Sequence, residues 1–479
     1  AGMDEARVRE LLASNEGEAE VEVEIERAAG LGIRSVPTFV LGDRYKVALA
    51  ADVAFQPLLG PRSPRDWPLR LQWQGAAGAG DVAGPAAPTA WQLGERSAER
   101  RCGACVERWD FAPERAQQTF RFDTFGDETQ WTDALRMHEV IGAAVDPLTA
   151  LAVGLKVDSQ ALPAAVVQGI ENGSIDLSSP DTTVALIKLN AVVGIQGTVE
   201  NIAGKDTLTR VGITCAICHS TVDNSYAPGI GKRLDGWPNR DLDPGAIIAL
   251  SPAVNAAQRA AYQSWGKGRY DPRFNLDGIS SGQAIPPAYG LQGIHRTTTT
   301  GDGNDIAYWN RYVAVTQMGG HGSFSDPRTG VSVKNGNDDL VSAKLPALQI
   351  YQLSLTAPAP PPGSFDPVAA QRGKQVFEGQ AQCSTCHSGP HLTDANLRLH
   401  PVADVVSEPE PDGAPSWASR SATRQYRTSP LAGIWQHPPY FHNGSAPTLE
   451  AVVQTYNQRK SLGLNAAQAA DLVQYLKSL

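Results

Sequence analysis

The alternation of apolar and polar positions predicts a chain built mainly of short helices. Apolar residues fall near helical spacing over 131–141 and over 465–479, as on an amphipathic helix. Further helices are expected over 146–156 and 183–193. Asp366 followed by Pro367 is typical of a helix N-cap and first turn. Glycine-rich and proline-rich stretches between these segments predict loops, so we expect a mainly α fold.

Two pentapeptides of the form C-x-x-C-H interrupt this pattern. They comprise Cys215, Cys218 and His219 in the first copy, and Cys383, Cys386 and His387 in the second. Two thiols three positions apart lie on one face of a helical turn, where each can add to one vinyl group of a porphyrin while the adjacent imidazole faces the iron. A zinc site would need further ligands at matching spacing, and a thioredoxin-like pair would not need the histidine. The two copies predict two covalently bound c-type haems.

Composition and charge exclude several classes of protein. The 479 residues carry a formal net charge of −9, whereas a nucleic-acid-binding protein would show a basic stripe. No run of 18 or more apolar residues occurs, so no transmembrane segment is predicted. Haem attachment of this type takes place outside the bacterial cytoplasm, so we expect a periplasmic or otherwise extracytoplasmic protein. The acidic start of the chain shows no signal peptide, as expected if the signal was removed or if this is not the natural beginning of the cytochrome.

The first 50 residues differ in character from the rest of the chain. A charged segment over 15–27 predicts a solvated helix, and a short apolar run with a proline at its entry comes next, over 36–42. Together they resemble the tail of a DsbA-like thioredoxin fold over residues 1–50. No C-x-x-C precedes the apolar run, so we expect no dithiol activity from this fragment.

Residues 51–115 are rich in alanine, glycine, proline and arginine and predict a low-complexity linker. Within it, Cys102 and Cys105 are followed by Val106 instead of histidine, so we do not expect a third haem. A disulfide or an idle pair is favoured there over a redox dithiol. We interpret residues 1–115 as an accidental fusion or a misread open reading frame.

A proline-rich stretch divides the remainder of the chain. Residues 357–363 read APAPPPG, a composition typical of a stiff spacer between domains. We expect a first haem c domain over 116–356 and a second over 364–479. The second has the order of a class I cytochrome c, which is an opening helix, the haem motif and a closing apolar helix.

Three segments after the second haem motif carry a family resemblance. They are residues 426–435 (YRTSPLAGIW), 439–445 (PYFHNGS) and 448–453 (TLEAVV). Together they resemble the signature of the bacterial dihaem cytochrome c peroxidase and MauG superfamily, to which the rubber oxygenases are related. The resemblance covers most of 365–479. The segment before the first haem motif is much longer than in the peroxidases, which leaves the substrate open.

The resemblance implies a sixth iron ligand and a calcium ion. In this superfamily the second haem takes its sixth ligand fourteen residues after the histidine of the signature, as methionine in peroxidases and as tyrosine in MauG-like enzymes. Counted from His442, that position is Tyr456. A phenolate stabilises ferric and higher-valent iron, while the alternative is a packing residue on its helix. Family members also carry Ca²⁺ between their haem domains, and residues 302–305 (DGND) are either a cation loop or an ordinary turn.

The sixth ligand of the first haem is less clear from the sequence. The candidates by residue type are Met318, His321, His295 and His138. An iron with an open sixth position could bind peroxide or dioxygen, and His138 with Glu139 is our candidate catalytic pair to assist O–O cleavage.

Tryptophans Trp237, Trp309 and Trp435 are candidate electron relays between the haems, with core packing as the alternative for each. Two haems suit two-electron chemistry, because one iron can activate the oxidant while the other supplies the second electron. We therefore expect an enzyme, a periplasmic dihaem oxidoreductase of the peroxidase type that reduces hydrogen peroxide with electrons from a small redox protein.

Three other functions stay open. One is an electron-transfer cytochrome with both irons six-coordinate. Another is a MauG-like or oxygenase-type enzyme that uses peroxide or dioxygen to oxidise an organic substrate. The last is a thioredoxin-like chaperone module at the N-terminus, against which the missing dithiol argues. If Tyr456 closes the second haem, we expect the oxidant to meet the iron held by His219.

Overall fold

The computed structural model of the chain describes residues 38–41, 45–48, 56–57, 113–410 and 413–479. The chain forms two compact units, Ala1–Phe111 and Ala112–Leu479.

In the first unit the described residues form one small sheet. Its strands are β1 (Thr38–Leu41), β2 (Tyr45–Ala48) and β3 (Gln56–Pro57), paired antiparallel in the order β1-β2-β3. The apolar run predicted over 36–42 therefore contributes a strand. The DsbA-like fold stays a prediction, and Cys102 and Cys105 lie outside the described residues.

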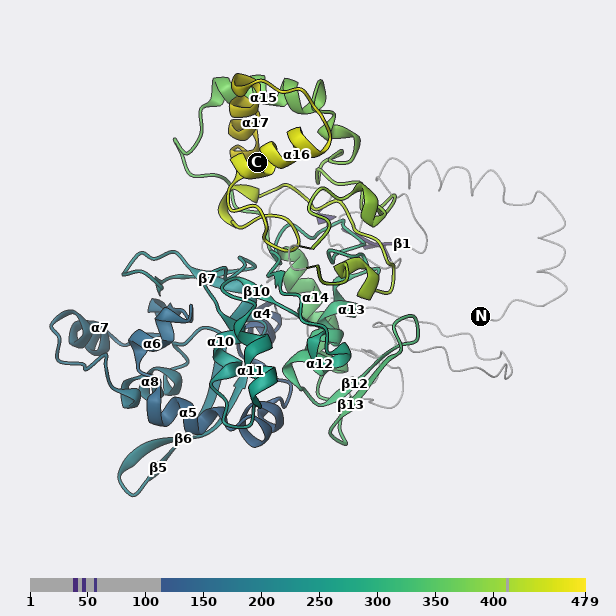
Figure 1. Cartoon of the computed structure of the whole chain (residues 1–479). Coiled ribbons are helices and arrows are strands. Elements are labelled where there is room, and N and C mark those ends of the chain that lie inside the picture. Colours follow the sequence, from purple (N-terminus) through teal and green to yellow (C-terminus); the bar gives the residue numbers. More distant parts are fainter. Residues whose placement is uncertain (1–37, 42–44, 49–55, 58–112, 411–412) are drawn as a thin grey trace, which may run out of the picture. The chain divides into compact units, whose positions relative to one another are not determined.

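The part of the second unit before the proline-rich stretch consists of short helices joined by loops (Figure 1). The helices are α4 (Pro113–Phe122), η3 (Thr129–Ala134), α5 (Met137–Ala144), α6 (Pro147–Ala152), η4 (Ser159–Ala161), α7 (Ala164–Glu171), α8 (Pro180–Lys188), α9 (Ala216–His219), α10 (Pro244–Ala249), α11 (Ala256–Gln263), α12 (Phe274–Asp277), α13 (Ile306–Val313), η5 (Ala314–Met318), η6 (Ser342–Lys344) and α14 (Leu345–Ser354). Two-stranded pairings link β4 (Val157–Asp158) with β8 (Ile230–Gly231), β7 (Ser220–Val222) with β9 (Arg233–Asp235), and β10 (Arg269–Tyr270) with β11 (Gln283–Ala284).

The helix predicted over 131–141 is interrupted. η3 is a π-helical turn, and α5 begins only after Arg136, whose φ of 56° lies in the left-handed region. Buried Trp131 anchors the turn, because its indole Nε1 donates to the carbonyl of Met318 at 3.0 Å. The hydrogen bond between Trp131 and Met318 therefore accompanies a π-helical turn where the apolar spacing alone predicts a continuous α-helix.

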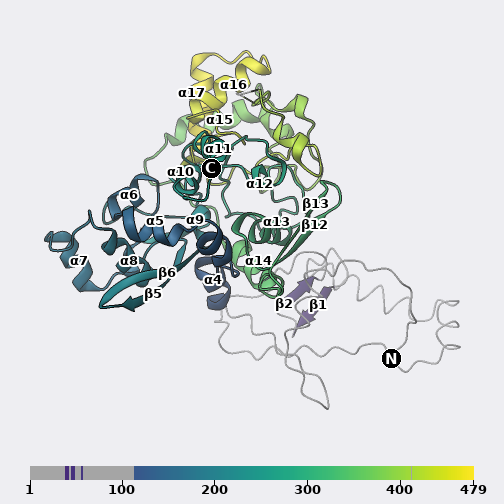
Figure 2. The same cartoon turned by 60° about the horizontal axis from the view of Figure 1, so that its bottom comes forward.

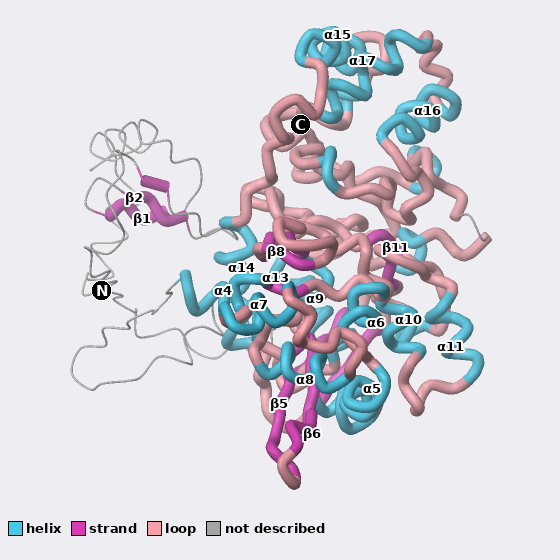
Figure 3. The backbone as a smooth tube through the Cα atoms, turned by 90° about the vertical axis from the view of Figure 1, so that its left-hand side faces the viewer, coloured by secondary structure: helices cyan, strands magenta, loops and turns pink. Residues whose placement is uncertain are grey.

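Two β-hairpins stand out from this helical background; Figure 1 labels both, and Figure 3 shows β5 and β6 in magenta. β5 (Ile195–Ile202) pairs with β6 (Lys205–Ile213), and β12 (Gly322–Asp326) pairs with β13 (Val331–Asn335). Ala203 and Gly204 join β5 to β6 with φ values of 52° and 85°, as a two-residue hairpin turn requires. β6 ends two residues before Cys215, so this hairpin leads the chain directly into the first haem motif.

The C-terminal part is built around a crossing of its first and last helices (Figure 2). Its elements are α15 (Pro367–Glu378), η7 (Cys383–Thr385), η8 (Val402–Asp404), η9 (Trp417–Arg420), η10 (Ile434–Gln436), α16 (Leu449–Arg459) and α17 (Ala466–Lys477). The carboxylate of Asp366 accepts from the amides of Val368 and Ala369, which confirms the predicted cap. At Gly373 of α15 a Cβ would lie 2.0 Å from the carbonyl oxygen of Asp471, so the close approach of α15 to α17 depends on glycine.

Each hydrophobic cluster of the described residues lies wholly on one side of residues 357–363. Two clusters, which include Phe120, Ile187 and Leu242, belong to the first part, and two, which include Phe377 and Leu472, belong to the second. Each part therefore has a core of its own. Within the described residues no helix has the length and apolar character needed to cross a membrane.

Candidate functional site

The first haem motif is held on a short helix at the end of β6. Gly194, with a φ of 81°, packs so closely that a Cβ would come within 2.2 Å of the backbone of Ile217 in α9. The carbonyl of His219 accepts a hydrogen bond from the amide of Gly236 at 2.8 Å. The motif is therefore clamped between two backbone segments.

The imidazole of His219 is fixed in one orientation. Its Nδ1 lies 3.1 Å from the carbonyl oxygen of Pro286, so Nδ1 carries the proton and Nε2 is the atom that can bind iron. Burial lowers the pKa of His219 to about 4, against a smaller opposing effect of the Pro286 hydrogen bond. The neutral imidazole, which is the form that binds metals, is thus present at pH 7. Burial also raises the pKa of the Cys215 and Cys218 thiols to about 12.

The second motif repeats this arrangement on a different local structure. Gln382, with a φ of 52°, turns the chain into η7, and Nδ1 of His387 lies 3.0 Å from the carbonyl oxygen of Leu392. Burial lowers the pKa of His387 and raises that of the Cys383 thiol to about 11. The ring of Phe377 lies 6.3 Å from the imidazole.

Both motifs therefore fit a covalently bound haem. Cys215, Cys218, Cys383 and Cys386 are free thiols. In each motif a main-chain carbonyl holds Nδ1 of the histidine and leaves Nε2 for the iron. Each motif thus provides one imidazole that can bind the iron and two thiols that can attach one haem.

Tyr456, the predicted sixth ligand of the second iron, lies on α16. Burial raises the pKa of its phenol to about 12, and the nearby thiols of Cys383 and Cys386 contribute in the same direction. The phenol on α16 therefore lies near the thiols of the second motif. Its ring lies 6.1 Å from that of Phe441 in the signature. This placement supports Tyr456 as a sixth ligand, which stays a prediction.

The other candidates for the first haem differ in what surrounds them. Met318 is buried in the same hydrophobic cluster as Ala216 of the motif. Both ring nitrogens of His321 have protein partners, since Nδ1 lies 2.7 Å from Asp338 and Nε2 lies 3.5 Å from Thr129. The bond at Nδ1 leaves only the long Thr129 contact at Nε2, so iron ligation by His321 stays a prediction. His295 has its backbone amide bound to the Asn396 side chain at 2.8 Å.

The predicted pair His138 and Glu139 is divided between the interior and the surface. Nδ1 of His138 is buried without a hydrogen-bond partner among the described residues. The Glu139 side chain is 47% exposed and forms an ion pair with Arg136 at 2.6 Å. Glu139 thus has a surface partner, and its catalytic role is a prediction that this placement does not favour.

Tyr270 and Gln317 form a polar pair that sequence reasoning missed. The Tyr270 hydroxyl donates to Oε1 of Gln317 at 2.8 Å. Burial raises the pKa of Tyr270 well above its ordinary value, and the nearby Cys218 adds to this shift. Tyr270 and Cys218 pack against the same hydrophobic cluster. Tyr270 and Gln317 are 47 positions apart, so only the fold brings them together.

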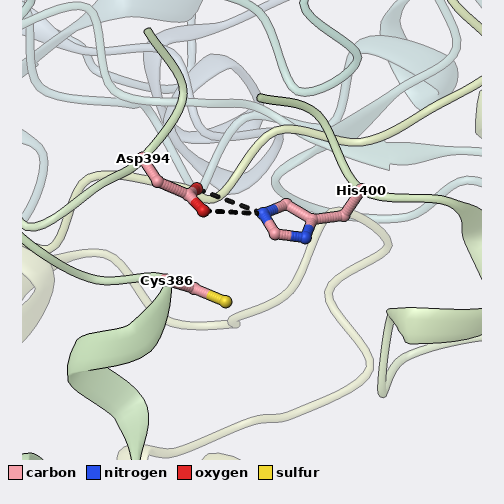
Figure 4. A group of neighbouring side chains, drawn as sticks. All are labelled: Cys386, Asp394 and His400. Atoms are coloured by element: carbon pink, nitrogen blue, oxygen red, sulfur yellow. Dashed lines mark hydrogen bonds and ion pairs between the residues drawn. The ribbon is translucent and has the colours of Figure 1, made fainter. Parts of the chain in front are cut away.

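Asp394 and His400 form a second polar pair, beside Cys386 (Figure 4). Nε2 of His400 lies 3.1 Å from both carboxylate oxygens of Asp394, and Nε of Arg398 lies 2.6 Å from Asp394 Oδ2. Ligand atoms of Cys386, Asp394 and His400 lie within 4.8 Å of one another. Because the haem motif commits Cys386 to a thioether, we interpret Asp394 and His400 as supports of the loop that comes after the motif.

His442 of the signature lies in a buried hydrogen-bonded network. Its Nε2 is 2.9 Å from Oε1 of Glu410 and 3.2 Å from the hydroxyl of Tyr426. The Tyr426 hydroxyl donates to Glu408 at 2.5 Å, and the amide of Asn443 donates to Glu410 at 3.0 Å. The signature histidine thus ties residues 407–410 to the loop 440–445.

Of the three candidate relay tryptophans, two meet. The rings of Trp237 and Trp435 are edge to face, with centroids 5.8 Å apart. Trp309 instead stacks on Tyr312 at 4.7 Å.

In the candidate cation loop, Asp302 pairs with Arg273 at 2.5 Å and Asp305 caps α13. Both carboxylates of that loop therefore have protein partners.

The fold and the two motifs define a haem c-binding protein with a cytochrome c-like C-terminal part. A model of the RoxA-like, cytochrome c-like family matches residues 425–462. The cytochrome-c peroxidase IdrP1 of Denitromonas iodatirespirans is 30% identical over 149 residues, which cover 23% of this chain and 40% of IdrP1. The methylamine utilization protein MauG of Methylorubrum extorquens is 30% identical over 122 residues, which cover 23% of this chain and 34% of MauG. Over about a quarter of its length the chain is thus similar to members of the dihaem cytochrome c peroxidase and MauG superfamily, which is the resemblance that its signature predicted.

The chain spans about two fifths of the length of the first of these relatives and about a third of the length of MauG. Among solved structures, Kuenenia stuttgartiensis hydrazine synthase aligns with a TM-score of 0.29 and 17% identity, covering 46% of this chain and 78% of that chain.

Proposed function

We propose that this chain is an extracytoplasmic dihaem oxidoreductase of the peroxidase type, which reduces hydrogen peroxide with electrons from a small redox protein. The observation that carries the proposal is the unlike surroundings of the two motifs. The Tyr456 phenol lies near the thiols of the second motif, whereas Tyr270, which is bonded to Gln317, lies near Cys218 of the first. When bound, two haems supply one iron for reaction with peroxide and a second iron for the other electron.

Tyr270 is the residue we assign to proton transfer at the first motif. Its raised pKa keeps the phenol protonated at pH 7, so the hydroxyl can donate a hydrogen bond. In the structure its single O–H donates to Oε1 of Gln317, so Gln317 positions the phenol, and the O–H would have to rotate from Gln317 to reach a bound oxidant. A positioned donor of this kind assists cleavage of the O–O bond. The buried phenol suits this role better than Glu139, which is bound to Arg136 at the surface.

Tyr456 is the residue we assign as sixth ligand of the second iron. An anionic oxygen ligand stabilises oxidised iron, and it would leave no position there for peroxide. The second motif would then serve to store and pass electrons. Trp237 and Trp435, which meet between the two parts, are the side chains we assign to that transfer.

The test is peroxide turnover by the full chain with both haems attached. A reduced small cytochrome c is mixed with protein and hydrogen peroxide, and its oxidation is followed by absorbance. We expect Tyr270→Phe to slow turnover by about a hundredfold or more, in line with the contribution of a positioned acid–base group. Tyr262→Phe is the matched control, because Tyr262 packs on Trp265 at 5.1 Å in the same region. Absence of turnover in both the resting and the half-reduced protein would reject the proposal.

A MauG-like oxidation of an organic substrate is the second candidate. Tyrosine instead of methionine at position 456 favours it. The discriminating result is peroxide consumption without oxidation of the reduced cytochrome, together with oxidation of an added organic reductant.

A further inference from the structure

Arg240 and Arg427 are half-buried, and in the described part of the chain no ion pair neutralises the positive charge of either one. The Nε atom of each is buried and has no hydrogen-bond partner there. Burial lowers the pKa of both guanidinium groups to about 10. Removing a charge from water without a counter-ion costs free energy. We therefore expect an anion to bind at each arginine.

Other buried arginines of this chain show the usual solution. Arg273 pairs with Asp302 at 2.5 Å, Arg420 pairs with Asp271 at 3.0 Å, and Arg233 pairs with Asp158 at 3.1 Å. Within the described residues Arg240 and Arg427 differ from these three, because each has no acidic partner and leaves a buried Nε without an acceptor.

Arg240 stands next to the first haem motif. It follows Asn239, whose amide donates to the carbonyl of Cys218 at 2.8 Å. Nη1 of Arg240 donates to the carbonyl of Pro439 at 2.6 Å. The side chain therefore extends from the first motif to the C-terminal part of the unit.

Arg427 stands next to the second motif in the same manner. It precedes Thr428, whose carbonyl accepts from the hydroxyl of Thr393 at 2.5 Å. Thr393 comes directly after Leu392, the carbonyl partner of His387. Nη1 of Arg427 donates to the carbonyl of Arg296 at 2.9 Å. Each part of the unit thus has one arginine near its own haem motif, and this arginine donates a hydrogen bond to a main-chain carbonyl of the other part.

The anion that both positions share is a carboxylate of the cofactor, because a haem carries two propionates. We propose that Arg240 binds a propionate of the haem attached to Cys215 and Cys218, and that Arg427 binds a propionate of the haem attached to Cys383 and Cys386. Nε and a second N–H of each guanidinium supply a charge-assisted pair of hydrogen bonds. Since Nη1 of each arginine holds the opposite part, haem binding also holds the two parts together.

The inference rests on the two haems of the proposed function, and its test needs no peroxide. A redox titration of the full chain with both haems, followed by absorbance, separates two midpoint potentials. Removing a positive charge near an iron stabilises its ferric form. Arg240→Gln should therefore lower one midpoint potential and Arg427→Gln the other. The lysine variants, which keep the charge, should restore most of each shift. Arg136→Gln at the surface is the control and should move neither potential.

Resonance Raman spectra give a second readout, the propionate bending band. Each glutamine variant should shift that band for the same haem whose potential it changes. If the glutamine variants do not fold, the propionate bending bands of the lysine variants test the assignment. Each band should shift, because a lysine cannot reproduce the paired hydrogen bonds of a guanidinium. Unchanged potentials and bands would mean that water satisfies the arginines, and shifts of the same haem by both variants would overturn the pairing. Shifted potentials without peroxide turnover would keep this assignment and reject the peroxidase function alone.

Discussion

Trp237 and Trp435 pack edge to face across the two parts of the unit, with ring centroids 5.8 Å apart and planes at 87°. The indole Nε1 of Trp435 donates to the carbonyl of Pro358 in the proline-rich stretch at 3.1 Å. Trp237 lies two residues before Asn239, which binds the first haem motif. The contact therefore joins the surroundings of one haem to the stretch that leads to the other.

Replacing Trp435 should slow electron transfer between the haems. We expect Trp435→Phe to lower the rate at which electrons placed on one haem reach the other, measured by flash reduction of the full chain, because the smaller ring loosens the edge-to-face contact. Trp309→Phe is the control, since Trp309 stacks on Tyr312 within the first part. Each variant should lose about 1 kcal/mol of stability from its aromatic pair. Equal transfer rates in the two variants would remove the Trp237–Trp435 contact from the path.

The crossing of α15 and α17 should be intolerant of any side chain at position 373. Gly373→Ala would place a Cβ 2.0 Å from the Asp471 carbonyl, so we expect a loss of about 3 kcal/mol or more in the free energy of unfolding. Gly142→Ala on α5 has open space around its Cβ and should gain about 0.5–1 kcal/mol. Urea unfolding measures both. A stable Gly373→Ala variant would contradict the close helix crossing.

The network around His442 should make stability depend on acidic pH. Burial of Glu410 acts to raise its pKa, but the hydrogen bonds from His442 and Asn443 outweigh it and leave the pKa below 4.5. A carboxyl whose folded pKa lies below its unfolded value stabilises the fold above the unfolded pKa, and this contribution is lost as pH falls through the folded pKa. Glu408 and Tyr426 face the same imidazole.

Glu410→Gln should therefore cost about 1–3 kcal/mol at pH 7 and flatten part of the fall in stability below pH 4.5. Thermal unfolding from pH 7 to about pH 3 measures the difference. Parallel curves for the wild type and the variant would show that Glu410 does not contribute to the acid transition.

Tyr456→Phe should change the absorption spectrum of one haem only. The phenol is expected to bind the second iron, so its loss opens or exchanges a ligand there and leaves the first haem unaltered. Tyr475→Phe is the matched control, because Tyr475 packs on Phe377 at 5.1 Å in the same core. An unchanged spectrum for Tyr456→Phe would remove this residue as a ligand.

The features found from the sequence are those that depend on neighbours in the chain. The haem pentapeptides, the Asp366 cap and the fourteen-residue step from His442 to Tyr456 are all short-range patterns. The β5–β6 hairpin was missed because its turn, Ala203–Gly204, lacks the usual asparagine or aspartate before glycine. The pairing of Tyr270 with Gln317 and the two arginines without acidic partners in the described residues depend on packing between distant segments. The pairing of His321 with Asp338 likewise becomes visible only in the fold.

The most direct test of the account is the electron paramagnetic resonance spectrum of the resting ferric protein with two attached haems, recorded before and after addition of hydrogen peroxide. We predict one high-spin signal, from the iron held by His219, which changes on adding peroxide, and one low-spin signal from the iron held by His387. Two low-spin signals that peroxide leaves unchanged, in both the resting and the half-reduced protein, would contradict the account and identify the chain as an electron carrier.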